Sequence, residues 1–124
     1  MAAQPSPEPF YSMARRAGDL LFMSGFGPVN TDLQVVGANI EEQTLYTLDL
    51  IKQALAHEGA TFADVVRVNV FLLDMADRDG FNAAYLRYFT GPMPTRRLIG
   101  AGDLYKGILV EIDCIAYVGG QGQP

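Results

Sequence analysis

Residues 108–118 read Ile-Leu-Val-Glu-Ile-Asp-Cys-Ile-Ala-Tyr-Val, and they show the sharpest alternation in the chain. Successive side chains of a strand point to opposite faces of its sheet, so every second residue shares a face. One face would carry only apolar residues: Val110, Ile112, Cys114, Ala116 and Val118. The other would carry Glu111 and Asp113 beside Ile115 and Tyr117, which makes it too apolar for open solvent and too charged for a core.

Outward from this strand, the chain predicts two helices and further short strands. Asn39 and Glu42 have the spacing of a capping box that opens a helix over residues 40–58, and Gly59 suits its end. A second helix is expected between residues 74 and 91, where four apolar residues recur at helical spacing: Phe81, Ala84, Tyr85 and Tyr88. The strands are expected at residues 10–14, 20–24, 34–36, 66–72 and 96–101, with a hairpin turn at 15–19. This order describes an α+β domain with both helices on one face of its sheet.

Length and composition limit the class of protein. The 124 residues have room for one domain, expected over residues 1–124 with loose tails at 1–9 and 119–124. A net charge of −5 argues against nucleic-acid partners and anionic membranes. One cysteine and one histidine allow neither a disulfide nor a metal cluster, so no metal or cofactor is expected. No apolar run approaches ~20 residues and no secretory signal is seen, so a cytoplasmic protein is expected.

The second face of the sheet lacks a predicted cover, because two helices can cover one face only. A homo-oligomer in which sheets face each other would cover it and would place its acids at a cleft between subunits.

Two residues are candidates for chemistry. Arg96 follows Pro94 and Thr95 at the start of a strand, where its guanidinium would offer a planar fork to a carboxylate. Glu111 is an acid in the middle of a partly apolar strand face, which suits a general acid or base. A surface arginine and a salt-bridged glutamate remain the alternatives. His57 is expected to interact with a helix dipole, and Cys114 to be a buried small hydrophobe.

Segments in order along the chain resemble the RidA/YjgF family of imine and enamine deaminases, from about Phe10 to Val118. The segments that carry the resemblance are Tyr11 with Gly18-Asp19, Ser24-Gly25, Glu42-Gln43-Thr44, Gly59-Ala60, Asp64-Val65-Val66, Val70-Phe71-Leu72, Phe81-Asn82-Ala83-Ala84-Tyr85, Pro94-Thr95-Arg96, Val110-Glu111-Ile112 and Ile115-Ala116. The resemblance implies a chorismate-mutase-like α+β fold, with a mixed sheet and two helices on one face. It also implies a homotrimer whose sites lie between subunits.

The same resemblance implies a reaction and a set of site residues. The reaction is hydrolysis of a 2-imino acid, or of its enamine tautomer, to a 2-keto acid and ammonia, without a cofactor. Arg96 would bind the substrate carboxylate and Glu111 would position or activate the attacking water. Five further positions would bind substrate: Tyr11, Ser24, Gly25, Asn82 and, through its backbone N–H, Leu98. We expect Tyr11, Ser24 and Glu111 of one chain to meet Asn82 and Arg96 of its neighbour.

Some residues depart from the family pattern and keep other functions open. Phe26 stands where Gln is usual, Leu98 where Cys is frequent and Phe10 where Pro is frequent, while Arg97 adds a second cation. Phe26 and Arg97 would suit a larger, flatter substrate, such as a 2-aminomuconate-like enamine from aromatic degradation. A non-catalytic, chaperone-like module that binds small carboxylates is the remaining alternative.

Overall fold

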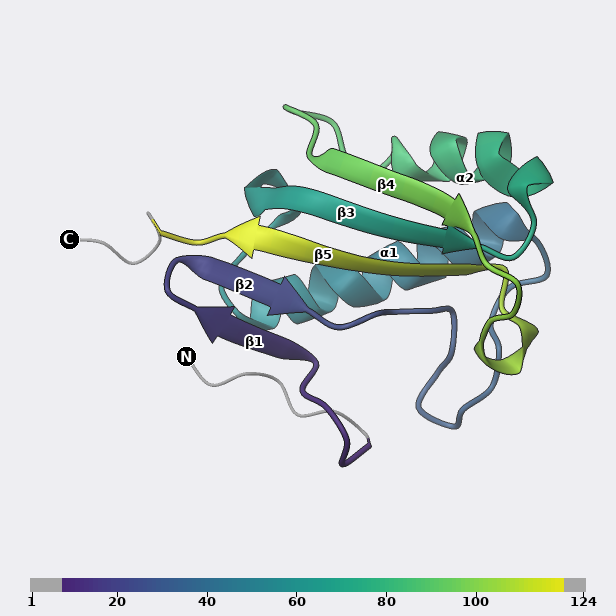
Figure 1. The fold of residues 1–124 in the computed structure, drawn as a ribbon, viewed down its shortest axis with the longest axis horizontal. Coiled ribbons are helices and arrows are strands. Elements are labelled where there is room, and N and C mark those ends of the chain that lie inside the picture. Colours follow the sequence, from purple (N-terminus) through teal and green to yellow (C-terminus); the bar gives the residue numbers. More distant parts are fainter. Residues whose placement is uncertain (1–7, 120–124) are drawn as a thin grey trace.

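A computed structural model describes residues 8–119, in which a five-stranded mixed sheet packs against two helices (Figure 1). The strands are β1 (Ala14–Ala17), β2 (Leu20–Met23), β3 (Val65–Leu72), β4 (Thr95–Gly100) and β5 (Val110–Tyr117). The helices α1 (Ile40–His57) and α2 (Arg78–Tyr85) cover the same face, behind the sheet in Figure 1. Three short 3₁₀ turns complete the elements: η1 (Phe62–Asp64), η2 (Met75–Asp77) and η3 (Tyr105–Gly107). The α+β class with both helices on one face is confirmed.

The strand order is β1-β2-β5-β3-β4, so β5 lies at the centre of the sheet and β4 at one edge. The pair β3 and β4 is parallel, and the other neighbouring strands are antiparallel. Residues 1–7 and 120–124, which hold most of the two expected tails, lie outside the described residues.

Helix α1 follows the sequence closely at both ends. The Glu42 N–H donates to Asn39 Oδ1 at 2.9 Å, as predicted for the N-cap. The Glu42 carboxylate accepts from the Ala38 N–H at 2.8 Å, so the predicted capping box closes one residue earlier than expected. Gly59 follows the helix with a φ of +78°, a value that glycine adopts without strain.

The core lies between the helices and the face of the sheet that β5 alternation predicted. Val110, Ile112, Cys114 and Ala116 of β5 are buried there. The alternation of buried and exposed side chains along β3 is interrupted by a β-bulge between Val65 and Arg67. Val65 is therefore buried, and Val66, the first apolar position of the predicted pattern, is 45% exposed.

Three expectations near the N-terminus are wrong. Arg15 and Arg16 belong to β1 and form no turn, because the pair Ala17↔Leu20 leaves only Gly18-Asp19 to turn the hairpin. The predicted strand at residues 10–14 therefore lies too early. The predicted strand at 34–36 is reduced to a single bridge between Val29 and Val35.

Helix α2 ends at Tyr85, earlier than the stop predicted at residues 91–94. Beyond Tyr85 the chain tightens into a turn, because the N–H groups of Arg87 and Tyr88 donate three residues back, to the carbonyls of Ala84 and Tyr85. The buried Phe89 ring stacks on the Tyr85 ring at a centroid distance of 4.3 Å. Tyr88 consequently lies in the turn that follows the helix.

The second face of the sheet stays open in the single chain. Phe22, Ile99 and Tyr117 are 42%, 42% and 51% exposed there. Large exposed apolar side chains on a sheet face mark a surface that a partner covers.

Candidate active site

The Arg96 half-site lies at the edge of the sheet, on the face that the helices cover. The parallel register pairs Val68 with Arg96, so the Arg96 side chain shares the face of the buried Val68. Its Cζ lies 4.9 Å from the centroid of the Tyr85 ring and 5.7 Å from that of Phe81. These cation–π contacts hold the guanidinium plane in place. No carboxylate among residues 8–119 forms an ion pair with Arg96, so the charge is available to an anion from outside the chain.

Arg96 opens onto a pocket of about 330 Å³. The pocket is lined by Asn82, Tyr85, Leu86, Met93, Pro94 and Arg96. The Asn82 side-chain oxygen is buried and has no hydrogen-bond partner in the described part of the chain. A buried acceptor without a partner is costly, so this oxygen suits a ligand or subunit that brings an N–H. The pocket therefore combines a cation that suits a carboxylate with a lining residue whose buried side-chain oxygen has no partner among the described residues.

Tyr85 stays protonated beside Arg96. Burial raises the pKa of the Tyr85 phenol, and the Arg96 charge opposes this rise only in part. The neutral ring remains a platform for the guanidinium.

The Leu98 backbone N–H faces away from β3. The Ala101 N–H donates to the Leu72 carbonyl at 2.8 Å, so Ala101 turns its N–H toward β3. Backbone groups alternate along a strand, which turns the N–H of Leu98, three residues earlier, to the free edge. The Leu98 side chain packs against the core. This direction fits the expected role of Leu98 as a donor.

The Glu111 half-site lies on the open face of the sheet. Phe26 and Ile112 exchange backbone hydrogen bonds of 2.7 and 2.9 Å, which hold Gly25 against Glu111. A Cβ added to Gly25 would lie 2.8 Å from Glu111 Oε2, so the carboxylate depends on glycine there. Burial first, and the Asp113 charge second, raise the pKa of the Glu111 carboxyl. A carboxylate with a raised pKa is a better proton acceptor.

Tyr11 and Ser24 lie at the same half-site. The Ser24 N–H donates to the Met13 carbonyl at 2.8 Å, and its hydroxyl donates to the Ser12 carbonyl at 2.5 Å. These bonds place the segment that contains Tyr11 beside Ser24 and Gly25. Tyr11 is 47% exposed and so can reach a ligand or a neighbouring chain. The segment with Tyr11 thus lies beside Ser24, and the next residue, Gly25, lies against Glu111.

A single chain does not bring the two half-sites together. Strand β3 separates β4 from β5, and its register pairs Phe71 with Glu111 but Val68 with Arg96. Phe71 and Val68 are three residues apart and face opposite sides, so Arg96 and Glu111 also point to opposite faces of the sheet. A molecule that contacts both side chains needs two copies of the chain.

Four residues that the sequence singled out lie elsewhere. Phe26 is buried in the core and lines neither half-site, so the expectation that it shapes a larger pocket is wrong. Arg97 pairs with Asn69 on the open face, away from the Arg96 pocket of its own chain. His57 Nδ1 lies at a hydrogen-bond distance of 3.0 Å from Oε2 of the buried Glu58 side chain, a contact that the sequence did not predict. Cys114 is buried as expected, which raises the pKa of its thiol to about 12.

Sequence reasoning missed two residues that support the half-sites. The Asn69 side chain donates to the Asp113 carboxylate at 2.7 Å and holds this acid two residues from Glu111. The Tyr85 ring supports Arg96. Tyr85 was recognised only as an apolar helix position. Both roles depend on strand register and helix placement, which no local pattern specifies.

The described residues contain neither a group of three or more metal-ligating side chains nor a helix long and apolar enough to cross a membrane.

Comparison with known proteins identifies relatives along nearly the whole chain. A family model described as Endoribonuclease L-PSP matches residues 1–118. A RutC family protein of Saccharolobus solfataricus is 39% identical, covering 90% of each chain. The chloroplastic Reactive Intermediate Deaminase A of Arabidopsis thaliana is 34% identical over 86% of this chain and 57% of that protein. The solved structure of a Rid family protein from Yersinia pestis superposes with a TM-score of 0.87 at 34% identity, covering 92% of each chain.

Proposed function

Because the chain belongs to the Endoribonuclease L-PSP family, which is the RidA/YjgF family, we propose that it hydrolyses 2-imino acids or their enamine tautomers. The products would be a 2-keto acid and ammonia. The observation that carries the proposal is the Arg96 guanidinium, which lies over an aromatic ring in a pocket without an acidic partner. The Arabidopsis relative named Reactive Intermediate Deaminase A supports this reaction class.

Substrate binding in this proposal begins with the carboxylate. The planar Arg96 fork would take its two oxygens, and the Leu98 N–H at the free edge of β4 would donate to the same molecule. The unpartnered Asn82 oxygen would accept from the N–H of the protonated imine. Anchoring both ends of the C=N unit holds its carbon in a fixed position for attack.

Hydrolysis would then need one placed water. Glu111 would take a proton from this water as the oxygen adds to the imine carbon, giving a tetrahedral amino alcohol. Glu111 would return this proton to the nitrogen and would then take the hydroxyl proton as the keto C=O bond forms, the C–N bond breaks and ammonia leaves. The raised pKa of Glu111 supports these proton transfers.

The proposal needs a second subunit, because the two half-sites of one chain lie on opposite faces of the sheet. Glu111, Tyr11, Ser24 and Gly25 lie on the open face, whereas Arg96 and Asn82 lie at the edge and on the helix side. We therefore propose a homotrimer in which the open face of one chain meets the β4 edge of the next. The exposed apolar side chains of the open face support such a contact.

The family description names an endoribonuclease, and two features favour a small acid over RNA as the substrate. The net charge of −5 opposes a polyanion. The one histidine, His57, is paired with Glu58 at the end of α1 and lines neither half-site.

A cytoplasmic location also stays a prediction, since the Arabidopsis relative is named chloroplastic.

The experiment is a coupled assay. An amino-acid oxidase generates 2-iminobutyrate, and the decay of the imine is followed with and without the protein. Wild-type protein should accelerate the decay, and Arg96→Ala should lower kcat/KM by about a hundredfold, because a charged partner of the substrate is lost. Arg78→Ala is the matched control, since this exposed arginine at the start of α2 lines neither half-site.

Other outcomes identify the alternatives. Turnover of a 2-aminomuconate-like enamine without imine turnover would support the pathway-specific deaminase. Carboxylate binding without turnover of either compound would support the binding module. Cleavage of RNA that Arg96→Ala leaves unchanged would contradict the proposal.

A further inference from the structure

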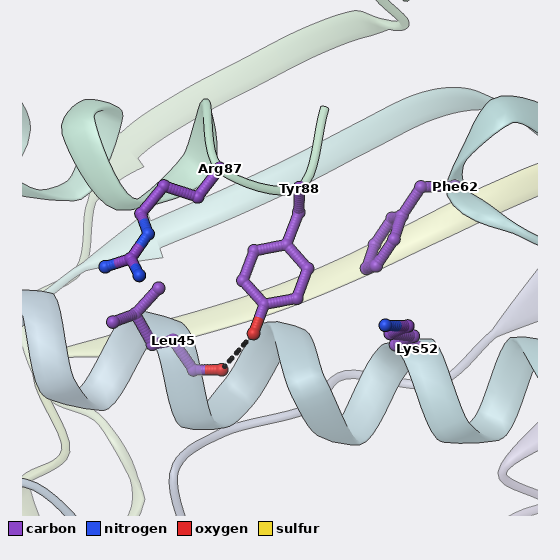
Figure 2. A pocket seen from close by; sticks show the side chains of 5 residues that line it. All are labelled: Leu45, Lys52, Phe62, Arg87 and Tyr88. Atoms are coloured by element: carbon purple, nitrogen blue, oxygen red, sulfur yellow. Dashed lines mark hydrogen bonds between the residues drawn. The ribbon is translucent and has the colours of Figure 1, made fainter. Parts of the chain in front are cut away.

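A second pocket lies on the helix side, and it shares no lining residue with the Arg96 pocket (Figure 2). It encloses about 420 Å³. Leu45 and Lys52 come from α1, Phe62 from η1, and Arg87 and Tyr88 from the turn after α2. Sites for small ligands are commonly about 300–1,000 Å³, so the volume is sufficient for one.

The charged residues that line this pocket are positive, whereas the chain as a whole is negatively charged. Two of its five lining residues are cationic and none is acidic, although the net charge of the protein is −5. Figure 2 shows Arg87 and Lys52 at opposite ends with the Tyr88 ring between them. Neither cation forms an ion pair among residues 8–119. Both are therefore available to an anion.

The aromatic wall of the pocket is already in place. The Phe62 ring meets the Tyr88 ring at 5.5 Å and 68°, and the Phe89 ring at 4.8 Å and 66°. The Tyr88 hydroxyl donates to the Leu45 carbonyl at 3.3 Å, which ties the ring to α1. A ligand that packs against such a wall does not have to order it first.

We propose that this pocket binds an aromatic carboxylate, with its ring against Phe62 and Tyr88 and its carboxylate on the Arg87 fork. The planar Arg87 guanidinium matches the two carboxylate oxygens, and Lys52 adds a point charge. This site is independent of the proposed deaminase reaction, because it lies outside both half-sites.

The Asp49 carboxylate acts electrostatically on Tyr88, a lining residue of this pocket. Its negative charge therefore opposes the binding of an anion. Burial first, and then the Asp49 charge, raise the pKa of Tyr88, while the Arg87 charge opposes the rise. The Asp49 carboxylate accepts from Gln53 Nε2 at 3.0 Å, which occupies part of it. Removal of this charge should tighten the binding of an anion.

The test is an NMR titration of the full-length ¹⁵N-labelled protein with naphthalene-2-carboxylate. It is done in the Arg96→Ala background, so that the carboxylate pocket of the proposed reaction does not contribute. We expect saturable shifts at Leu45, Lys52, Phe62 and Tyr88, and none with the neutral 2-naphthamide at the same concentration. Lys52→Gln with Arg87→Gln should weaken binding about tenfold or more, because two charge-assisted contacts are lost.

The first control removes two positive charges at positions outside the pocket, and a second variant removes the opposing negative charge of Asp49. Arg15→Gln with Arg16→Gln, two exposed arginines of β1, should leave the affinity unchanged. Asp49→Asn should tighten binding several-fold. Equal binding of the amide, an unchanged affinity in the Lys52/Arg87 variant, or shifts confined to Asn82 and Met93 would each overturn the proposal. None of these results depends on whether the protein turns over an imine.

Discussion

The Glu111 carboxylate lies against the backbone of Gly25. Gly25 has no positive φ, so its backbone does not require glycine. The absence of a side chain is what matters, because it leaves room for the Glu111 carboxylate. The same carboxylate lies near Asp113, which Asn69 holds in position from β3. Local packing thus sets both the position and the pKa of the proposed base.

Gly25→Ala should abolish most of the deaminase activity with little loss of stability. The new Cβ would approach Glu111 Oε2 to 2.8 Å, and the end of a flexible side chain can move away from it. We expect kcat to fall at least about tenfold as the base is displaced, and Tm to change by a few degrees at most. Gly91→Ala is the control, since its Cβ would meet nothing within 4 Å. Equal activity of the two variants would contradict the role of Glu111.

Asp113→Asn should move the acid limb of the pH–activity profile to lower pH. Glu111 must be deprotonated to accept a proton, so activity falls as pH drops through its pKa. The Asp113 charge raises this pKa, and its removal lowers it, so activity should persist to lower pH. The measurement is kcat/KM as a function of pH across the acid limb of the profile. Asp79→Asn, an exposed acid on α2, should leave the limb where it is.

Among the helices and strands, α1 is specified by local sequence signals, whereas the orientation of β4 depends on its pairing with β3. α1 begins and ends at local signals, Asn39 and Gly59. Edge strand β4 depends on its neighbour, since its register on β3 decides that Arg96 points to the helix side and Arg97 to the open face. The rings of Phe62, Phe89 and Tyr85 then connect η1 to the Arg96 guanidinium through successive contacts.

Asn39→Ala should lower the free energy of unfolding by about 1 kcal/mol, because the Glu42 N–H loses its acceptor at the helix start. Urea unfolding measures the change, with an unchanged m-value as the sign that only stability moved. Asn39→Asp should keep most of the stability, since a carboxylate also accepts this bond. A full loss in Asn39→Asp would show that the cap is not the cause.

At the scale of the whole molecule, the division of the site between two faces is the decisive feature. Arg96 and Glu111 are separated by β3 and by the thickness of the sheet. The open face that carries Glu111 also exposes Phe22 and Tyr117, so it has the composition of a buried contact. One assembly would therefore bury this face and complete the site.

Mixing two inactive variants tests this arrangement directly. Arg96→Ala retains Glu111, and Glu111→Gln retains Arg96. After joint unfolding and refolding at equal concentrations, random trimers should regain about one quarter of the wild-type activity, because each mixed trimer contains one intact site. Arg96→Ala mixed with Arg78→Ala, whose two half-sites are intact, calibrates the refolding yield. No recovery in the first mixture, with recovery in the second, would contradict sites shared between chains.

The sequence anticipated what local patterns can encode. Alternation in β5 separated Glu111 from the core residues correctly, and Asn39 and Gly59 marked α1 within one residue. Local patterns failed where distant contacts act. The bulge at Val65 and Val66 exposes a valine, and α2 gives way to a tighter turn after Tyr85. Phe26, expected at a pocket wall, fills the core.

The sequence by itself determined the α+β class, the two faces of β5, the start and end of α1, and the resemblance that singled out Arg96 and Glu111. These depend on residues close together in the chain, whose spacing selects helix or strand. Only the tertiary structure decided that Arg96 lies over Tyr85 and that Arg97 faces the other way. It also separated Arg96 from Glu111 across the sheet. The physical reason is register, which depends on how distant strands pack and which places each side chain on one face or the other.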